Sequence, residues 1–264
     1  MKEYYLANYH AHGKWCNHAD GDEEKYIYEA IQNKMNVVGF SEHAPFPDNR
    51  FFRMDYSELD LYIKEIKRLK EKYKDNLHIV CGLEIEYFAD DKKYYEELLD
   101  KIEIDYLILG QHYFEHEGKI YRTKELKSTK EVLSYAESLC EAMKTNMFKI
   151  IAHPDYFGCN DLVMDEYLLQ AMNLIINTAI ETNTILEVNA NGFRKNKVES
   201  KMGFRRKYPL DEFWKLAMDK KVNVIIGSDC HSNGLLWDEA VESTYNLISK
   251  YKLNQIKNNI IIDL

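Results

Sequence analysis

The stretch "NVIIGSDCH" (residues 223–231) runs from three β-branched residues into Asp229 and His231, two side chains that bind metal ions in many proteins. A short uninterrupted run of this kind predicts a strand buried on both faces, as in a parallel sheet. The same pattern, an apolar run that ends in polar or metal-binding groups, occurs six more times. These runs are "YYLANYH" (4–10), "NVVGFSEH" (36–43), "HIVCGLEIEY" (78–87), "YLILGQH" (106–112), "KIIAHPD" (149–155) and "TILEVNAN" (184–191).

Segments with the helical spacing of apolar residues separate these runs. Four of them are 56–74, 128–147, 211–221 and 237–251. Strands that alternate with helices predict an α/β fold whose parallel sheet is covered on both faces. Seven such units favour closure of the sheet into a barrel, although an open sheet has the same periodicity. The 264 residues contain no low-complexity linker, so we expect a single domain over 1–264.

The composition restricts the class of protein. With 45% hydrophobic and 30% charged residues, the sequence is typical of a soluble globular protein with a large core. A formal net charge of −9 argues against a nucleic-acid partner. Five cysteines without a CxxC pair favour neither a disulfide framework nor a thiolate zinc site. There is no signal-peptide pattern and no run of roughly 20 apolar residues, so we expect a cytoplasmic protein without a membrane partner.

The histidines gather at the predicted strand ends. A single histidine is ordinarily a core or surface residue without a ligand, but seven of the nine fall at or just after a strand end. In a parallel barrel, the carboxyl ends of all strands open onto one face, where the catalytic groups of such enzymes lie. We therefore expect one metal site, built from residues some 220 positions apart. Its expected ligands are His10, His12, His18, His43, Glu84, His112, His153, Asp229 and His231.

This set of ligands indicates the chemistry of the site. His10 and His12 are two residues apart and therefore share one face of an extended strand. Imidazoles and carboxylates without thiolates suit zinc, iron or manganese. Nine ligands exceed the three or four that one ion needs, so we expect two or three ions. Divalent ions roughly 3.5–4 Å apart are typical of in-line displacement at phosphorus.

A phosphoester substrate also needs a cationic side chain. The segment "NGFRKNK" (191–197) provides Arg194 just beyond the sixth run, and a guanidinium there can hold a phosphate through two hydrogen bonds. The alternative for Arg194 and the nearby "FRRK" (204–207) is a solvated basic loop.

Together these motifs resemble the PHP (polymerase and histidinol phosphatase) superfamily. The resemblance spans Tyr9 to Ser232 and follows the family's order. The motifs are HxH at 10–12, His18, "SEH" (41–43), "GLE" (82–84), "GQH" (110–112), "AHPD" (152–155) and "GSDCH" (227–231). "NANGFRK" (189–195) and "KYP" (207–209) are similar to the histidinol-phosphatase branch. Residues 195–207 form a longer insertion than the family pattern has.

The resemblance implies a distorted (β/α)7 TIM-like barrel with a trinuclear metal centre at the carboxyl ends of the strands. It implies that His10, His12, Glu84 and Asp229 hold the first ion. Glu84 bridges to a second ion, which His112 and His153 also hold. His18, His43 and His231 hold the third. In "GLEIEYF" (82–88), Glu84 matches the family position better than Glu86 because it follows the Gly-x step.

The activity that the resemblance implies is hydrolysis of L-histidinol phosphate to L-histidinol and phosphate, a step of histidine biosynthesis. Arg194 would bind the phosphate, and Asp229 or His231 would contribute to proton transfer. Candidates for the amino-imidazole end are Phe114, Glu115 and Tyr156. Two alternatives stay open, a different small phosphomonoester as substrate and a non-catalytic metal-binding protein. An exonuclease is disfavoured because the chain has no basic stripe.

Two features of the chain are left open by its sequence. The segment "FPDNRFFRMD" (46–55) is a candidate lid over the cavity or a contact between subunits. A homo-oligomer is therefore possible on the sequence alone.

Overall fold

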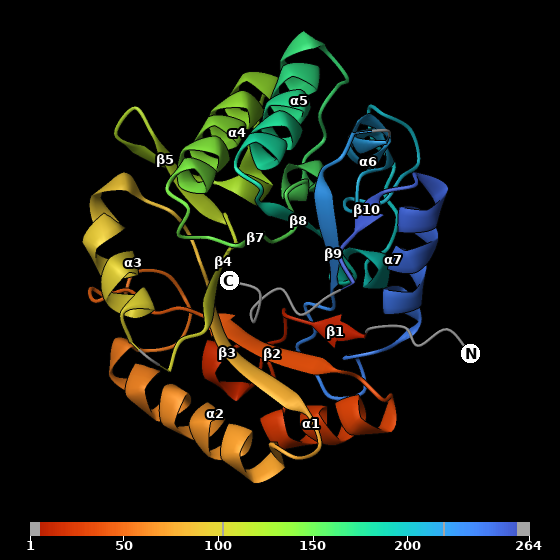
Figure 1. The fold of residues 1–264 in the computed structure, drawn as a ribbon. Helices are drawn as coiled ribbons and strands as arrows, with labels where there is room; N and C mark the ends of the chain where they lie inside the picture. The colour runs from red at the N-terminus through yellow and green to blue at the C-terminus, as the bar shows by residue number, and fades with distance from the viewer. Residues whose placement is uncertain (1–5, 102, 219, 258–264) are drawn as a thin grey trace.

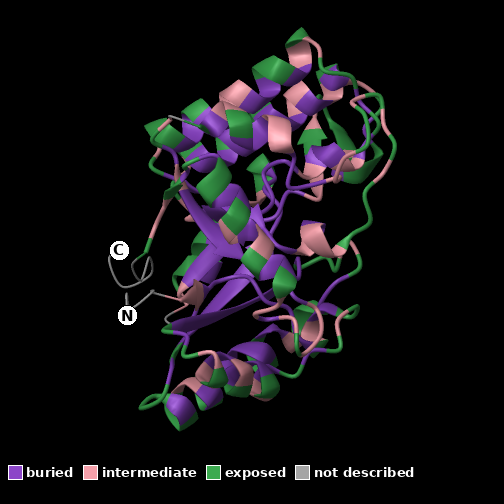
Figure 2. Cartoon of the chain, turned by 90° about the vertical axis from the view of Figure 1, so that its right-hand side faces the viewer, coloured by how far each residue is buried: buried purple, intermediate pink, exposed green. Residues whose placement is uncertain are grey.

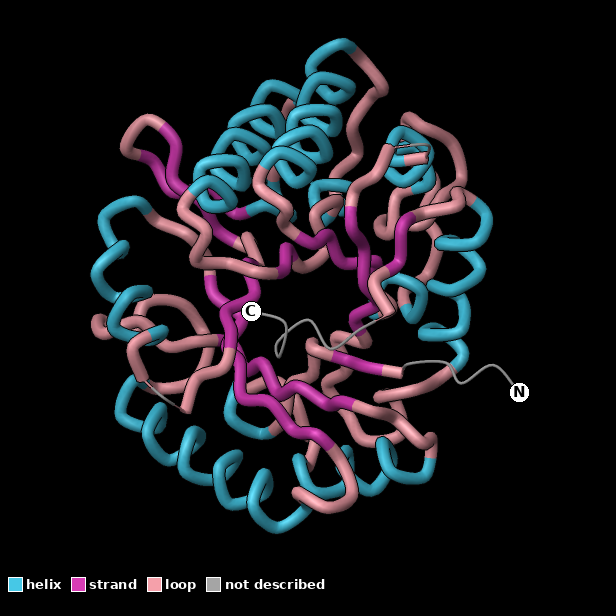
Figure 3. The backbone as a smooth tube through the Cα atoms, viewed as in Figure 1, coloured by secondary structure: helices cyan, strands magenta, loops and turns pink. Residues whose placement is uncertain are grey.

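Parallel strands arranged around a common axis form the main sheet of the computed structural model, which describes residues 6–101, 103–218 and 220–257 (Figures 1 and 3). The strand order is β1-β2-β3-β4-β7-β8-β9-β10. Their bounds are β1 Ala7–Asn8, β2 Val37–His43, β3 His78–Ile85, β4 Tyr106–Leu109, β7 Ile150–Ile151, β8 Ile185–Asn189, β9 Asn223–Gly227 and β10 Asn254–Gln255.

The barrel closes between the first and last predicted strands. Ala11 forms an isolated parallel bridge with Cys230, and Asp229 N donates to His10 O at 2.8 Å. These bonds join the chain beyond β1 to the chain beyond β9, at the carboxyl ends of the strands. The α/β barrel built from seven predicted strands is thus confirmed, with one of its seams made by two loops rather than by two long strands.

Two elements were not expected from the sequence. β5 (Tyr113–His116) and β6 (Lys119–Arg122) form an antiparallel hairpin after β4, and β10 adds a parallel pairing to the start of β9. Both are short, and the hairpin lies apart from the main sheet. It extends the loop after β4, which lies at the carboxyl ends of the strands.

Helices surround the sheet, with their buried faces toward it (Figures 1 and 2). Their bounds are α1 Glu23–Gln32, α2 Leu59–Tyr73, α3 Lys92–Leu99, α4 Thr129–Lys144, α5 Glu166–Glu181, α6 Asp211–Ala217 and α7 Glu239–Lys250. Short 3-10 helices lie in the loops at η1 Lys14–Cys16, η2 Tyr56–Glu58, η3 Ala89–Asp91, η4 Thr123–Glu125, η5 Tyr156–Cys159 and η6 Asn191–Arg194. No helix in the described part of the chain is both long and apolar enough to cross a membrane.

The predicted helices are present, with ends fixed by local capping. Ser128 caps α4 in a capping box with Glu131, and the Asp238 side chain accepts from Val241 N at the start of α7. α6 ends at Ala217, earlier than the predicted 211–221, part of which lies outside the described residues.

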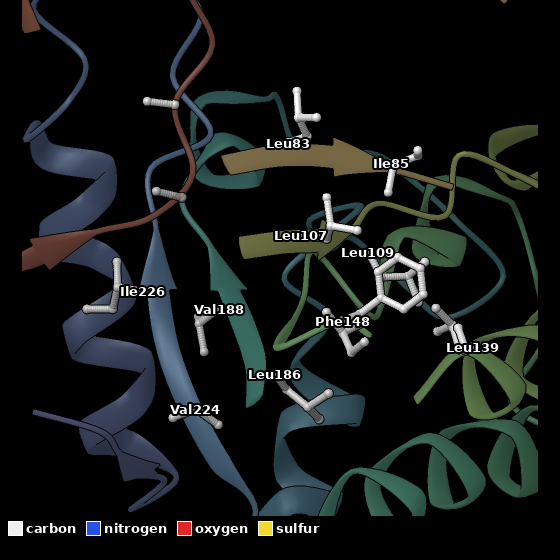
Figure 4. Close-up of a cluster of buried hydrophobic side chains, with 14 of the residues drawn as sticks. Leu83, Ile85, Leu107, Leu109, Leu139, Phe148, Leu186, Val188, Val224 and Ile226 are labelled. Carbon is white, nitrogen blue, oxygen red and sulfur yellow. The ribbon is translucent and has the colours of Figure 1, made fainter. Parts of the chain in front are cut away.

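Side chains alternate between an inner and an outer apolar layer along the strands. Figure 4 shows part of the outer layer, in which Leu83 and Ile85 of β3 and Leu186 of β8 lie between sheet and helices. The inner layer fills the barrel with residues such as Val80 and Ile108. Because successive strand residues point to opposite faces, Glu84 lies on the inner face between Leu83 and Ile85. Glu187 follows Leu186 onto the same inner face. The strand pattern therefore places carboxylates above the apolar floor of the barrel.

Candidate metal centre

Glu84 lies at the centre of a cluster of histidines. Its Oε2 is 3.0 Å from His43 Nδ1 and 3.3 Å from His12 Nε2, and its Oε1 is 3.0 Å from His153 Nε2. Two further imidazoles within 4 Å are those of His10 and His112, at 3.4 and 3.9 Å. One carboxylate thus contacts five rings that come from four different strands or the loops after them. This is the geometry of a group that can bridge two cations.

Asp229 and His231 continue the cluster toward the solvent. Asp229 Oδ1 lies 3.5 Å from His12 Nε2 and 3.5 Å from His231 Nδ1. His231 Nε2 in turn lies 3.2 Å from His18 Nε2. The structure therefore brings all nine expected ligands into one continuous group. The floor of the group is buried, whereas His18 at its edge is exposed.

Burial and neighbouring charges set the protonation of the cluster. Burial, together with the His231 ring, lowers the pKa of His12 to about 3. Burial acts in the same direction on His10, but the carboxylates around it raise the pKa of His10 well above its usual value. Burial acts to raise the pKa of Glu84, yet the imidazoles hold it well below its usual range. Anionic carboxylates beside imidazole lone pairs are suitable ligands for a divalent cation.

Two of these residues adopt a strained backbone. His153 has a φ of 30° and Asp229 a φ of 48°, in the left-handed region that residues with a Cβ rarely occupy. Hydrogen bonds hold both residues in place, since Asp229 N donates to His10 O and His153 N donates to Glu187 Oε2. Strain of this kind persists where surrounding contacts fix it, and it is common at functional sites.

Several triads in the cluster have the geometry to hold a metal ion, because their ligand atoms lie within 4.8 Å of one another. Three of them contain only expected ligands: His10/His12/Asp229, His12/His43/His231 and His43/Glu84/His112. Cys16 reaches two other groups, but burial raises the pKa of its thiol to about 12. A protonated thiol is a poor ligand, so the donor set is one of imidazoles and carboxylates. It fits zinc, iron or manganese.

The cavity above the cluster has a volume of about 360 Å³, which suits a small molecule. Its floor is formed by members of the cluster, including Glu84 and Asp229. Its remaining walls carry four cations, four aromatic rings and one amide: Arg53, Arg122, Lys124, Lys195, Phe52, Tyr113, Tyr156, Tyr208 and Asn191.

Other residues of the chain hold the guanidinium of Arg194. Its Nε and Nη2 pair with Asp238 at 2.9 and 3.0 Å, and its Nη1 donates to Ser228 O at 2.6 Å. Nη2 also donates to Leu235 O at 2.8 Å. Arg194 is absent from the residues that line the cavity, and its contact with phosphate stays a prediction. The next residue, Lys195, does reach the cavity.

The candidates for the amino-imidazole end differ in their positions. Tyr156 lines the cavity, with its ring centroid 5.0 Å from that of His153. Phe114 is fully buried and stacks on Tyr121, and Glu115 lies exposed on the hairpin outside the cavity. Only Tyr156 of the three is therefore placed to meet a ligand.

Most residues of the cavity wall were not predicted from the sequence. Phe52, in the candidate lid segment, lines the cavity and is 73% exposed. Arg122 and Lys124 come from the end of the hairpin, which no periodic pattern in the sequence predicted. Glu187 lies in the run 184–191 and is not among the expected ligands, although its inward position could be predicted from the alternation of residues along that strand.

The fold and the cluster define a class, a parallel α/β barrel with a histidine and carboxylate site at the carboxyl ends of its strands. Within that class, the family model described as "PHP domain" matches residues 8–191, more than half of the chain. This chain therefore belongs to the PHP-domain family, which confirms the resemblance seen in the motifs.

Named relatives agree with this assignment. A probable histidinol-phosphatase of Deinococcus radiodurans is 25% identical over 239 residues, which cover 87% of each chain. Histidinol-phosphatase of Bacillus subtilis is 26% identical over 255 residues, covering 85% of this chain and 93% of the relative. The crystal structure of a histidinol phosphate phosphatase from Lactococcus lactis, complexed with zinc, L-histidinol and phosphate, aligns with a TM-score of 0.70. It shares 20% identity and the alignment covers 95% of each chain.

Proposed function

We propose that this protein is a metal-dependent phosphomonoesterase that hydrolyses L-histidinol phosphate to L-histidinol and phosphate. The observation that carries the proposal is the convergence of nine side chains of metal-ligand type, seven of which line a cavity of small-molecule size. The relatives named as histidinol-phosphatases, which match along most of the chain, support the choice of substrate. We expect the enzyme to act in the cytoplasm, in histidine biosynthesis, without a nucleic-acid or membrane partner.

The residues of the cluster fit two or three divalent ions. His10, His12, Glu84 and Asp229 would hold one, and Glu84 would bridge to a second. His112 and His153 complete the second site, and a third would lie among His18, His43 and His231. Such ions, when bound, stabilise charge on phosphate oxygens as Lewis acids.

The cavity wall supplies the remaining functions. Lys195 and Lys124 are cations that form no ion pair with another described residue, and they line the cavity that the phosphate would enter. Tyr156 presents an aromatic surface next to His112 and His153 for the imidazole of the substrate. His231, which is partly exposed, and Asp229 beside it are the groups that we expect to contribute to proton transfer to the departing alkoxide.

Phosphate release by the purified protein tests this function. We expect turnover of histidinol phosphate that stops on chelation and returns with zinc, iron or manganese. We also expect kcat/KM for histidinol phosphate to exceed that for 4-nitrophenyl phosphate by at least about a hundredfold, as a site built for one polar substrate allows. Near-equal values would indicate a phosphatase for another small phosphomonoester. Tight metal binding without release from any phosphomonoester would indicate a metal-binding protein.

A further inference from the structure

His10 presents its two ring nitrogens to different partners. Its Nε2 faces the cluster, 3.0 Å from His12 Nε2 and 3.4 Å from Glu84 Oε2. Its Nδ1 lies 2.7 Å from Oε1 of Glu187, a residue outside the nine expected ligands. Glu187 is 0% exposed. A fully buried carboxylate therefore stands behind a ligand histidine, on the side away from the other ligands.

Glu187 is itself fixed in position. Its Oε2 accepts hydrogen bonds from His153 N at 3.0 Å and from Asn189 Nδ2 at 2.8 Å. Gly227 on the neighbouring strand leaves the space that the carboxylate occupies, because a Cβ at that position would lie 1.6 Å from Glu187 Oε1. Among the described residues, no lysine or arginine forms an ion pair with Glu187. Glu187 is therefore a buried carboxylate that is held in place against His10.

Glu86 occupies the comparable position behind His112, with a different environment. Its carboxylate lies 3.4 Å from His112 Nδ1, a nitrogen that makes no hydrogen bond. Arg53 instead pairs with both oxygens of Glu86, and both side chains are buried. The charge of Glu86 is thus balanced by Arg53 and acts little on the ring.

A carboxylate that accepts the second N–H of a ligand histidine fixes the tautomer and orientation of the ring and makes it a more basic ligand. We infer that Glu187 is a positioning residue that makes the group of His10, His12 and Asp229 the tightest cation site. The Arg53–Glu86 pair leaves the site that includes His112 the weaker one. This inference rests on the metal centre of the proposed function.

Cation titration of the apo-protein tests the inference without use of activity. Zinc affinities are measured by competition with a chromophoric chelator, and the visible spectrum of the cobalt-loaded protein reports the ligand field of each site. We expect Glu187→Gln to weaken the tightest zinc site about 10- to 100-fold and to shift its cobalt bands. Glu86→Gln should leave that site within about threefold. Circular dichroism shows whether each variant folds. If Glu187→Gln does not fold, Glu187→Asp is measured in its place.

Asp105→Asn is the matched control. Asp105 is also a carboxylate that accepts a backbone N–H, from Cys81 at 2.6 Å, but it directly precedes β4 at the opposite end of the barrel. Its variant should bind zinc like the wild type. A tightest site that is equally strong in the wild type and the Glu187 variants would overturn the inference. A wild type that takes up no cation at all would instead contradict the proposed function.

Discussion

Glu84 illustrates how a single residue determines the site. Its carboxylate contacts five imidazoles, and Gly110 gives it room, since a Cβ there would lie 2.0 Å from Glu84 Oε1. Its two oxygens lie within 3.3 Å of the rings of His12, His43 and the buried His153. The function of the cluster therefore depends on one buried negative charge.

Replacement of Glu84 by Gln should remove this bridge. We expect the variant to lose at least one bound ion and roughly 10³-fold in kcat/KM, because a bridged ion supplies several kcal/mol of charge stabilisation. Plasma mass spectrometry of the protein and phosphate release measure the two effects. Full metal content with activity within threefold of the wild type would refute the bridging role.

Lys195 is the residue of the basic loop that faces the cavity, whereas Arg194 is held by Asp238. We expect Lys195→Ala to lower kcat/KM for histidinol phosphate by about tenfold, the effect of losing roughly one charge-assisted hydrogen bond. Steady-state kinetics measure this change, with metal content as the control. An unchanged kcat/KM would place the phosphate away from Lys195.

The loop elements at the carboxyl ends are joined by Arg194. It connects η6 to the loop after β9 and to Asp238, which caps α7. Burial acts to raise the pKa of Asp238, but the hydrogen bonds of Arg194 lower it below its usual value. A carboxyl with a depressed folded pKa stabilises the fold above its unfolded pKa, and that contribution is lost as the pH falls through the folded pKa.

Asp238→Asn should therefore be destabilising in a pH-dependent way. The ion pair is lost while Asn still caps the helix, so we expect about 1.5–3 kcal/mol of destabilisation at pH 7. The difference from the wild type should shrink below about pH 4. Urea unfolding at pH 7 and at pH 3 measures it. Asp165→Asn, a change at the cap of α5 where no arginine pairs with the carboxylate, should cost only a few tenths of a kcal/mol. Equal costs at both pH values for Asp238→Asn would contradict the role of the ion pair.

The elements also show which features the sequence could predict. The apolar runs determined seven strands and the capped helices α4 and α7, because burial and capping act locally. β10 and the hairpin of β5 and β6 carry only two to four residues a strand, too few for a periodic signal. The orientation of the Arg194 side chain was not predictable for a related reason. Its position in the sequence located its loop, but the partners Asp238 and Ser228 that orient its side chain come from other parts of the chain.

Across the whole molecule, the site depends on closure of the barrel. Ala11 and Cys230 join the two ends of the sheet, and each lies beside predicted ligands, His10 and Asp229 among them. The convergence of the nine candidate side chains was predictable because strand ends converge in any parallel barrel. The cavity wall was not, because its residues come from irregular loops whose path the periodicity of the sequence does not fix.

Because its ligands come from all parts of the barrel, metal binding should stabilise the entire fold. A cation at 100 times its Kd adds about 2.7 kcal/mol to the free energy of unfolding, when the unfolded chain does not bind it. For a domain of this size, the chelated protein should melt roughly 5–10 °C lower, since about 1 kcal/mol corresponds to 2–4 °C. Calorimetry before and after chelation measures the shift. An unchanged melting temperature after chelation would mean that the cluster binds no ion in the native protein.

Anomalous X-ray scattering from crystals of the native protein, recorded at the zinc, iron and manganese edges, tests the central claim most directly. We predict two or three anomalous peaks within coordination distance of the nine side chains, with one of them beside both Glu84 and Asp229. Diffraction data of adequate quality without any peak among these side chains would contradict the account.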